Sequence, residues 1–295
     1  MTASHTANSS TVLVTGGTEG LGRATALLLA GEGFRVFAGG RNAQRRAALD
    51  AEAQKRKLPL STLEMDVADD DSVNRAISEI EQLAGPVEIL INNAGIAIAA
   101  TMEDISLADL HKIFETNYFG VVRVTQRVLP AMRERRRGRI INLSSVAGKF
   151  ATPIFGPYSS TKHAVEAMSD ALRIELLPFG IYVAIIEPGY IPSNMEAAAT
   201  ELSSAYVERA ESSPYQMVYR GFRSSWGRVT ANPKYKPEDC ARVILQAIRD
   251  TPPRPRYLVT ASAHVVKWMR RLLPDRTLDR MVAKDHGLKA PDRNS

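Results

Sequence analysis

A tyrosine and a lysine, four residues apart, are the side chains best suited to move a proton in this sequence. Tyr158 and Lys162 would lie on one face of a helix, because residues four apart are neighbours on a helix surface. An ammonium at about 4 Å supplies ~4 kcal/mol at an effective dielectric of ~20, enough to lower a phenol pKa of ~10 by about 3 units. Ser145, at the expected end of an upstream strand, would place a hydroxyl beside them. These three residues predict general acid/base chemistry at a carbonyl.

A glycine-rich turn could hold a pyrophosphate. Gly16, Gly20 and Gly22 lie between a short apolar run and a helical pattern. Glycines let the backbone approach a pyrophosphate, whose charge faces the free N–H groups and the positive end of the helix dipole. A structural tight turn uses the same residue type, and the spacing is G-x-x-x-G-x-G rather than G-x-G-x-x-G. The surrounding strand, turn and helix pattern favours a dinucleotide site.

The end of the second expected strand bears on the choice of dinucleotide. A carboxylate there would accept from a 2′-hydroxyl, whereas a cation would bind a 2′-phosphate. Gly40 stands where an acid could, and Arg41 follows it, so NADP is favoured over NAD. Arg41 could instead be an ordinary solvated charge, although an arginine at a helix start opposes the dipole.

Two further loops would border the adenosine. Asp66 and Val67 follow the third expected strand, where the carboxylate could accept from an adenine amino group. Asn93, Ala94 and Gly95 follow the fourth strand, where small residues would let the adenosine lie close and amides could tie neighbouring strands together.

These residues need a scaffold, and short β-rich runs alternate with helical patterns from Thr11 onward. Such alternation implies right-handed crossovers and a parallel sheet covered on both faces. We therefore predict an α/β fold, a single-domain Rossmann fold with a doubly wound seven-stranded parallel sheet and helices on both faces. The expected strands are Val12–Val14, Phe34–Ala38, Leu60–Met65, Val87–Ile91, Ile140–Leu143, Tyr182–Ile186 and Arg256–Val259.

Composition supports one large folded unit. With 295 residues and 44% apolar content, the chain can bury a large core, which excludes disorder. Its one cysteine, Cys240, excludes internal disulfides and a multi-cysteine metal site, so we expect no metal and a cytoplasmic location. The longest charge-free stretch is shorter than the ~20 apolar residues of a membrane span, so no transmembrane segment is expected. We expect a flexible tail at 1–10, an NADP-binding and catalytic domain at 11–260 and a basic helical extension at 261–295.

Residues 194–236 have a looser pattern and are expected to form a lid over the substrate. Large apolar and aromatic side chains interrupt a polar background there and suit an apolar wall, although some are expected to pack on the domain. They are Tyr206, Tyr215, Met217, Tyr219, Phe222 and Trp226.

The basic excess of the chain lies mainly at its C-terminus. From Thr251 to Ser295 there are ten Lys/Arg and four Asp, within a total formal charge of +6. The stretch 263–273, with His264, Trp268 and Met269, is amphipathic and could rest on an anionic membrane or cap the substrate mouth. Packing on its own domain is favoured. A second cluster at 133–139 is read as a solvated helix end rather than a nucleic-acid site, and His163 as a surface or packing residue.

The sequence resembles the short-chain dehydrogenase/reductase family, of the single-domain kind, over about residues 11–260, and is nearest its hydroxysteroid and retinol dehydrogenase-like branch. The motifs TGGTEGLG, NNAG, the serine of INLSS, YSSTK and EPG carry the resemblance. It implies Tyr158 as acid/base, Lys162 as pKa depressor and ribose ligand, and Ser145 as carbonyl orienter. It implies Asn117, in FETNYFG, as the anchor of a water relay.

The resemblance also implies a cofactor-binding set. Ser193 stands where the family often has threonine, and Glu19 where some NADP-preferring members place a base. The set is Gly16, Thr18, Glu19, Gly20, Leu21, Gly22, Arg41, Asp66, Val67, Asn93, Ala94, Gly95, Tyr158, Lys162, Pro188, Gly189, Ile191 and Ser193.

The implied function is NADP-dependent hydride transfer between a ketone or aldehyde and an alcohol, on a lipophilic small molecule resembling a steroid, a retinoid or a long-chain compound. One alternative is a 3-oxoacyl-carrier or small-carbonyl reductase of the same fold. Another is a non-catalytic NADP(H)-binding sensor or scaffold. A homodimer or homotetramer formed through helices at 117–129 and 165–176 is expected, with no nucleic-acid partner.

Overall fold

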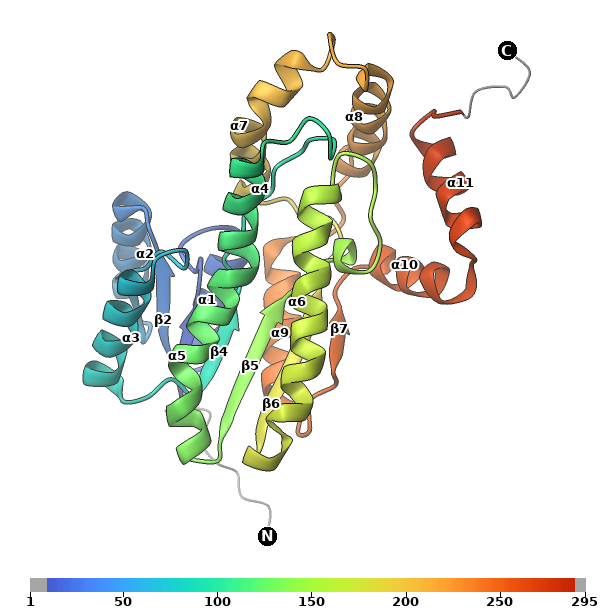
Figure 1. Cartoon of the computed structure of the whole chain (residues 1–295). Helices are drawn as coiled ribbons and strands as arrows, with labels where there is room; N and C mark the ends of the chain where they lie inside the picture. Colours follow the sequence, from blue (N-terminus) through green and yellow to red (C-terminus); the bar gives the residue numbers. More distant parts are fainter. Residues whose placement is uncertain (1–9, 290–295) are drawn as a thin grey trace.

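Within residues 10–289, which the computed structural model describes, one seven-stranded parallel sheet forms the centre of the molecule (Figure 1). The spatial order is β3-β2-β1-β4-β5-β6-β7, with the reversal beside β1 that a doubly wound sheet requires. The predicted fold class is confirmed. The strands are β1 (Thr11–Val14), β2 (Arg35–Gly40), β3 (Leu60–Glu64), β4 (Ile89–Asn92), β5 (Gly138–Leu143), β6 (Ile181–Glu187) and β7 (Arg256–Leu258).

Helices cover both faces of the sheet, and each face has its own apolar core. Val12 and Val14 of β1 pack toward α1 (Gly20–Gly31), α2 (Ala43–Lys55) and α9 (Pro237–Arg249). Leu13, between them, packs on the other side with α3 (Asp70–Ala84), α5 (Gly120–Glu134) and α6 (Gly156–Glu175). This alternation follows from the period of two along a strand, and burial on both faces explains the apolar run Val12-Leu13-Val14.

A π-helical stretch interrupts the helix that begins above the sheet. α4 (Leu107–Phe114) begins at Ser106, whose side chain accepts from the Asp109 N–H, and continues through Glu115–Phe119 into α5. Single π-helical turns inside α-helices often mark functional sites. This one contains Asn117.

The segment 194–236 folds mainly as two helices above the sheet in Figure 1, α7 (Asn194–Arg209) and α8 (Gln216–Thr230). The C-terminal part adds α10 (Ala261–Leu272) and α11 (Asp275–Asp285), at the right of the same view. Asp285 of α11 accepts hydrogen bonds from Ser225 and Arg228 of α8, so the end of α11 is fastened to α8.

Residues 1–9 of the expected tail and 290–295 of the expected extension lie outside the described residues. Ser10 was also assigned to the flexible tail, and that assignment is wrong. Its side chain is buried and donates a hydrogen bond of 3.0 Å to Glu88, beside the start of the sheet. Among the residues that the structure describes, no helix has the length and apolar content to cross a membrane.

Candidate active site

The three residues expected to do acid/base chemistry meet at the carboxyl end of β5. Tyr158 and Lys162 lie on α6, and the Lys162 Nζ is 5.7 Å from the centre of the Tyr158 ring. The same Nζ donates a hydrogen bond of 2.9 Å to the carbonyl of Leu143, the last residue of β5. Ser145 follows that strand and caps a short 3₁₀ turn, where its Oγ accepts from the Ala147 N–H at 3.1 Å.

The protonation of the pair differs from the expectation. Burial raises the pKa of Tyr158 to about 12, and a hydrogen bond with Ser145 offsets only part of that rise. Burial also lowers the pKa of Lys162 to about 8, against the opposing effect of the Glu166 carboxylate. The direction is opposite to the predicted lowering by the ammonium, because desolvation of the phenol dominates. Tyr158 holds its proton at neutral pH and is suited to donate it.

Asn117 connects the loop after β4 to the catalytic helix. Its side chain is fully buried, with Oδ1 accepting from the Ile96 N–H at 2.8 Å and Nδ2 donating to the Ile96 carbonyl at 2.8 Å. Nδ2 also donates to the Thr161 Oγ1 at 3.1 Å, next to Lys162. These bonds fix the position of the amide beside the lysine. The role of Asn117 in a water relay stays a prediction.

The loops after β5 and β6 are joined directly. The N–H of Val146 donates to the Pro188 carbonyl at 3.0 Å, so the residue after Ser145 is tied to the Pro188-Gly189 turn. A Cβ at Gly189 would lie within 2.5 Å of the Ser262 Oγ and even closer to the Thr260 Oγ1. The start of α10 therefore packs directly against the edge of the site.

The glycine-rich turn forms a backbone cradle between β1 and α1. Gly16 and Gly20 have positive φ values of +59° and +51°, which glycine adopts most readily. A Cβ on Gly22 would overlap the Gly16 carbonyl oxygen, and Asn93 Nδ2 donates to the Thr15 and Gly16 carbonyls at 2.9 and 3.0 Å. Because these glycines have no side chains, the backbone N–H groups of the turn remain accessible to a ligand. Such a turn fits the pyrophosphate of a dinucleotide.

At the end of β2, the absence of a side chain at position 40 is a packing requirement. A Cβ on Gly40 would lie 2.5 Å from the Thr18 Oγ1, so an acid there would require the Thr18 side chain to move. Arg41, which follows, is largely exposed, and its Nη1 is 3.4 Å from Asp66. The two predicted residues are thus neighbours at the expected adenosine end.

Glu19 acts as a link between elements. Its carboxylate pairs with Arg45 of α2 and accepts from Asn194 Nδ2 of α7 at 3.0 Å. Ser193 lies beside this link, with its Cβ 3.3 Å from the position that a Cβ on Gly20 would occupy. Arg45 was not identified from the sequence, although it lies on the first turn of a helix that starts beside Arg41.

A buried charge network lies behind Lys162 and was also missed. Glu166 and Glu187 are almost completely buried, and Lys149 Nζ is 2.6 Å from Glu166 Oε2. Arg256 reaches both carboxylates, at 3.0 Å from Glu166 and 3.1 Å from Glu187. Burial and the neighbouring Glu166 raise the pKa of Glu187 to about 7. The positions of the two glutamates in the sequence could have indicated this network. Glu166 is four residues after Lys162, on the same helix face, and Glu187 directly precedes the Pro188-Gly189 turn.

An aromatic cluster borders Tyr158. The Phe155 ring centre is 6.0 Å from that of Tyr158, 5.2 Å from Phe222 and 5.1 Å from Trp226. Tyr190 adds an edge-on contact to Trp226 at 5.3 Å. Of the six residues expected to form an apolar wall, Phe222 and Trp226 belong to this cluster. Phe155 and Tyr190 were not identified from the sequence.

The other members of the expected wall have different positions. Tyr206 and Tyr219 are buried against the domain, where the hydroxyls donate to Asp109 and Asp104. Tyr215 donates to Glu103 at 2.6 Å, and Met217 is exposed. Tyr206 and Tyr219 are thus among the residues that pack on the domain instead, because their hydroxyls bond to Asp109 on α4 and to Asp104 in the loop before it. His163 is exposed, and its Nδ1 is 2.9 Å from the Ser159 carbonyl.

Comparison with known proteins agrees with this geometry. Residues 10–203 match the family model described as short chain dehydrogenase. The chain belongs to the short-chain dehydrogenase/reductase family. The resemblance noted from its motifs is thereby confirmed.

Relatives of this short-chain dehydrogenase/reductase carry several names. It is 39% identical over 194 residues to dehydrogenase/reductase SDR family member 7B of Xenopus laevis, covering 64% of this chain and only 60% of that protein. It is 32% identical to the NADPH-dependent 3-dehydrocapnine reductase of Ornithobacterium rhinotracheale, covering 92% and 96% of the two chains. A solved structure of a variant of actinorhodin polyketide ketoreductase with NADPH is similar at 29% identity and a TM-score of 0.75, covering 88% and 98%.

Proposed function

We propose that this protein interconverts a ketone or aldehyde and an alcohol with NADP(H), acting on a lipophilic substrate. The observation that carries the proposal is the meeting of the protonated Tyr158 with Ser145 and Lys162 at the edge of the glycine cradle. NADPH bound there would supply the hydride for reduction of the carbonyl carbon. Every proton transfer in this reaction would be carried out by the protein's own side chains.

Each catalytic side chain has a separate task. The Ser145 hydroxyl donates to the substrate carbonyl oxygen and holds it beside Tyr158. Tyr158 then gives its proton to that oxygen as negative charge develops there, which is general acid catalysis. Lys162, with its pKa lowered to about 8 by burial, stabilises the phenolate that remains and contacts the ribose. Oxidation of the alcohol uses the same groups in reverse.

The remaining cofactor contacts are assigned by position. Gly16, Gly20 and Gly22 give the pyrophosphate its backbone donors, while Asp66 and Val67 border the adenine. A further group of residues lines the path of the cofactor from β1 to β6. They are Thr18, Leu21, Asn93, Ala94, Gly95, Pro188, Gly189, Ile191 and Ser193.

The preference for NADP rests on the end of β2. Gly40 itself supplies no acid to a 2′-hydroxyl. Arg41 and Arg45, which pair here with Asp66 and Glu19, offer cations to a 2′-phosphate. The NADPH named for the 3-dehydrocapnine reductase and for the ketoreductase structure supports the same choice.

The substrate class rests on the cluster of Phe155, Tyr190, Phe222 and Trp226 beside Tyr158. Such a wall favours a bulky apolar ketone or secondary alcohol, with burial of one large apolar group contributing about 1.5–3 kcal/mol. We assign residues 194–236 as the lid that carries Phe222 and Trp226 over the substrate. The likeness to a polyketide ketoreductase makes an acyl thioester reductase the second candidate.

We place the protein in the cytoplasm as a homodimer or homotetramer. The family's usual pairing through α5 and α6 is consistent with the exposed Ile174 on α6, which is 68% accessible. Sedimentation velocity would show the assembly, and Ile174→Glu should weaken it.

One screen tests the proposal. Ketones and alcohols of graded size, together with an acetoacetyl thioester, are assayed with NADPH/NADP and NADH/NAD by the absorbance of the reduced nicotinamide. We expect NADPH to be preferred, the bulky lipophilic compounds to have the highest kcat/KM, and Arg41→Ala to lose most of the preference, a contact worth ~1.5–3 kcal/mol. Arg75→Ala, an exposed arginine on α3, is the matched control. Equal use of both cofactors, or a thioester as best substrate, would overturn the corresponding half.

A further inference from the structure

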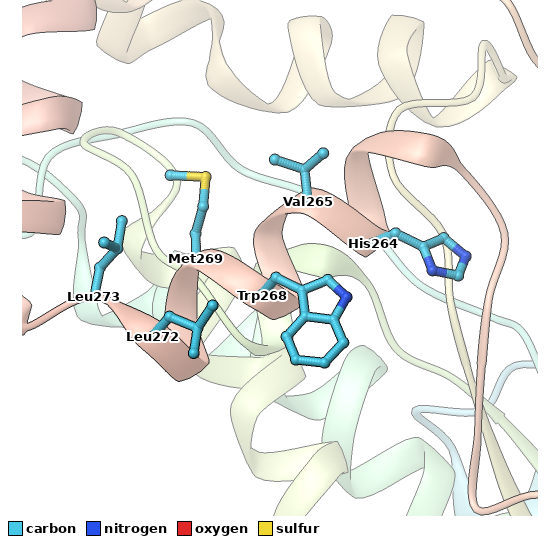
Figure 2. Close-up of a pocket in the computed structure, with 6 residues that line it drawn as sticks. All are labelled: His264, Val265, Trp268, Met269, Leu272 and Leu273. Atoms are coloured by element: carbon cyan, nitrogen blue, oxygen red, sulfur yellow. The ribbon is translucent and has the colours of Figure 1, made fainter.

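The apolar side of α10 is exposed to solvent. Packing of this helix on its own domain was the favoured interpretation of the sequence, and it holds only for the inner side, where Ala263 is buried. Val265, Trp268 and Leu272 are 57%, 53% and 69% accessible, among the most exposed large apolar residues described. Figure 2 shows these side chains projecting from the α10 ribbon, together with the others that line a shallow open depression, His264, Met269 and Leu273.

The exposed residues form a continuous stripe. Val265, Trp268 and Leu272 follow the three- and four-residue spacing of one helix face, and Met269 lies beside them. Isolated apolar residues on a surface are ordinary, but a contiguous stripe on one helix marks an interaction surface. At 12 residues, α10 is about 18 Å long by the 1.5 Å rise per residue, too short to span a bilayer.

Cations accompany the stripe. Residues 261–289 contain seven Lys/Arg and three Asp. Lys267 and Arg271 on α10, and Arg276 and Arg280 on α11, form no ion pair among the residues that the structure describes, and Arg270 pairs with Asp275. An apolar stripe with a surface tryptophan and unpaired cations has the chemistry of a helix that lies in the plane of an anionic membrane surface.

A second copy of this chain fits the surface less well. Two-fold pairing through the stripe would bring together two copies of the same basic region, which has seven Lys/Arg and three Asp over 261–289. Like charges at an interface oppose association, whereas an anionic lipid surface would attract them. Charge complementarity therefore selects the lipid.

We propose that α10 binds peripherally to anionic lipid surfaces, with Trp268, Val265 and Leu272 in the headgroup region and the surrounding cations, Lys267 and Arg271 among them, attracted by the lipid phosphates. The helix begins at Thr260, whose hydroxyl packs against Gly189 at the edge of the candidate active site. Binding at α10 would hold that edge near the bilayer. The lipid binding goes beyond the proposed reaction and does not depend on it.

The test is binding of the full chain to phosphatidylcholine vesicles with and without phosphatidylglycerol, measured by co-sedimentation. Binding is expected only to the anionic vesicles and should weaken as salt is added. Lys267→Gln with Arg271→Gln should lower the binding constant about 30-fold, because each cation near an anionic surface contributes about fivefold. The matched control is Arg75→Gln with Arg133→Gln, which removes two exposed arginines elsewhere and should change binding little.

A second readout reports on the stripe itself. The chain has two tryptophans, so in a Trp226→Phe background the emission comes from Trp268 and should shift to the blue on anionic vesicles. Leu272→Asp should abolish the shift, while its circular dichroism and Tm stay unchanged because the side chain is exposed. Absence of vesicle binding, an equal loss in the control pair, or self-association that Leu272→Asp removes would each overturn the proposal.

Discussion

The carboxyl edge of the sheet and the cap above it, defined as residues 194–236 and 261–289, are held in place by different interactions. At the sheet edge, close backbone approaches dominate, with Gly22 against the Gly16 carbonyl and Gly16 against the Ala94 Cα. In the cap, side chains dominate. Tyr206 donates to Asp109 on α4, Tyr219 donates to Asp104 in the loop before α4, and Asp285 fastens α11 to α8.

The difference has consequences for substitution. A side chain that clashes with backbone atoms can be accommodated only if the backbone moves, which is energetically costly. The sheet edge should therefore tolerate few substitutions and should fix the type of chemistry. A hydrogen bond or exposed ion pair contributes about 0.5–1.5 kcal/mol and can be exchanged for another. The cap is therefore the region in which substrate preference can change while the fold persists.

The largest expected effect is at the sheet edge, from removal of the proposed proton donor. Tyr158→Phe should lower kcat by at least ~10²-fold while NADPH binding is retained, because the ring remains and only general acid/base catalysis is lost. Tyr182→Phe, on β6 and packed under Arg139, is the matched control and should leave kcat unchanged. Turnover and fluorescence titration of NADPH measure the two quantities. A phenylalanine variant with near-normal turnover would remove Tyr158 from the mechanism.

Two glycines of α1 test the backbone argument directly. Gly22→Ala should weaken NADPH binding at least tenfold and lower stability by about 1–3 kcal/mol, because its Cβ would overlap the Gly16 carbonyl and the Asn93 amide. Gly31→Ala has open space at the same helix and should raise stability by about 0.5–1 kcal/mol through helix propensity. Thermal unfolding and NADPH titration distinguish them. Equal behaviour of the two variants would show that the cradle is not as tightly packed as its geometry indicates.

The same difference between the sheet edge and the cap explains which features could be predicted from the sequence. The order of strands, the glycine turn and the positions of Tyr158, Lys162 and Ser145 all follow from local patterns, namely apolar runs, glycine spacing and helical periodicity. A clash such as that of Gly40 with Thr18 involves residues far apart in the chain, and no local pattern shows it. The fold class and the elements were therefore predicted more fully than the contacts between them.

Side-chain partners were the main source of error. The tyrosines of the cap looked alike in sequence, but Tyr206 and Tyr219 have carboxylate partners from the 101–109 segment, whereas Trp226 meets Phe155 and Tyr190. The spacing of these six aromatic and apolar residues does not indicate which of them has a hydrogen-bonding partner. The pKa of Tyr158 was mispredicted for a similar reason, since desolvation depends on the whole surrounding packing.

The link between α11 and α8 tests the cap. Asp285→Ala should release Ser225 and Arg228, with a local cost of about 0.5–1.5 kcal/mol, and raise KM for bulky substrates up to about tenfold while kcat for small ones is unchanged. Asp279→Ala, on the same helix and exposed, is the matched control. Hydrogen exchange of α8 should become faster only in the first variant. Unchanged exchange in α8 would show that the C-terminal helices do not support the lid.

The smallest expected effect concerns Glu187, at the point where β6 leads into the site and Arg256 of β7 leads toward α10. Burial raises the pKa of Glu187 to about 7, whereas a glutamate in an unfolded chain titrates near 4.5. Between these pH values the folded state binds more protons than the unfolded state, so the free energy of unfolding falls as pH rises. This contribution is fully present below about pH 4.5 and is lost above about pH 7.

Glu187→Gln should therefore flatten the fall in Tm between about pH 5 and pH 8, since glutamine stays neutral throughout. The change is expected to be on the order of 1 kcal/mol, or about 2–4 °C, because Arg256 and Lys149 also attract the ionised form and oppose the effect of burial. Glu79→Gln, an exposed carboxylate on α3, should leave the slope as it is in the parent protein. Differential scanning calorimetry across this range measures both variants. If Glu187→Gln keeps the full slope, another group titrates there and Glu187 is already ionised in the folded protein.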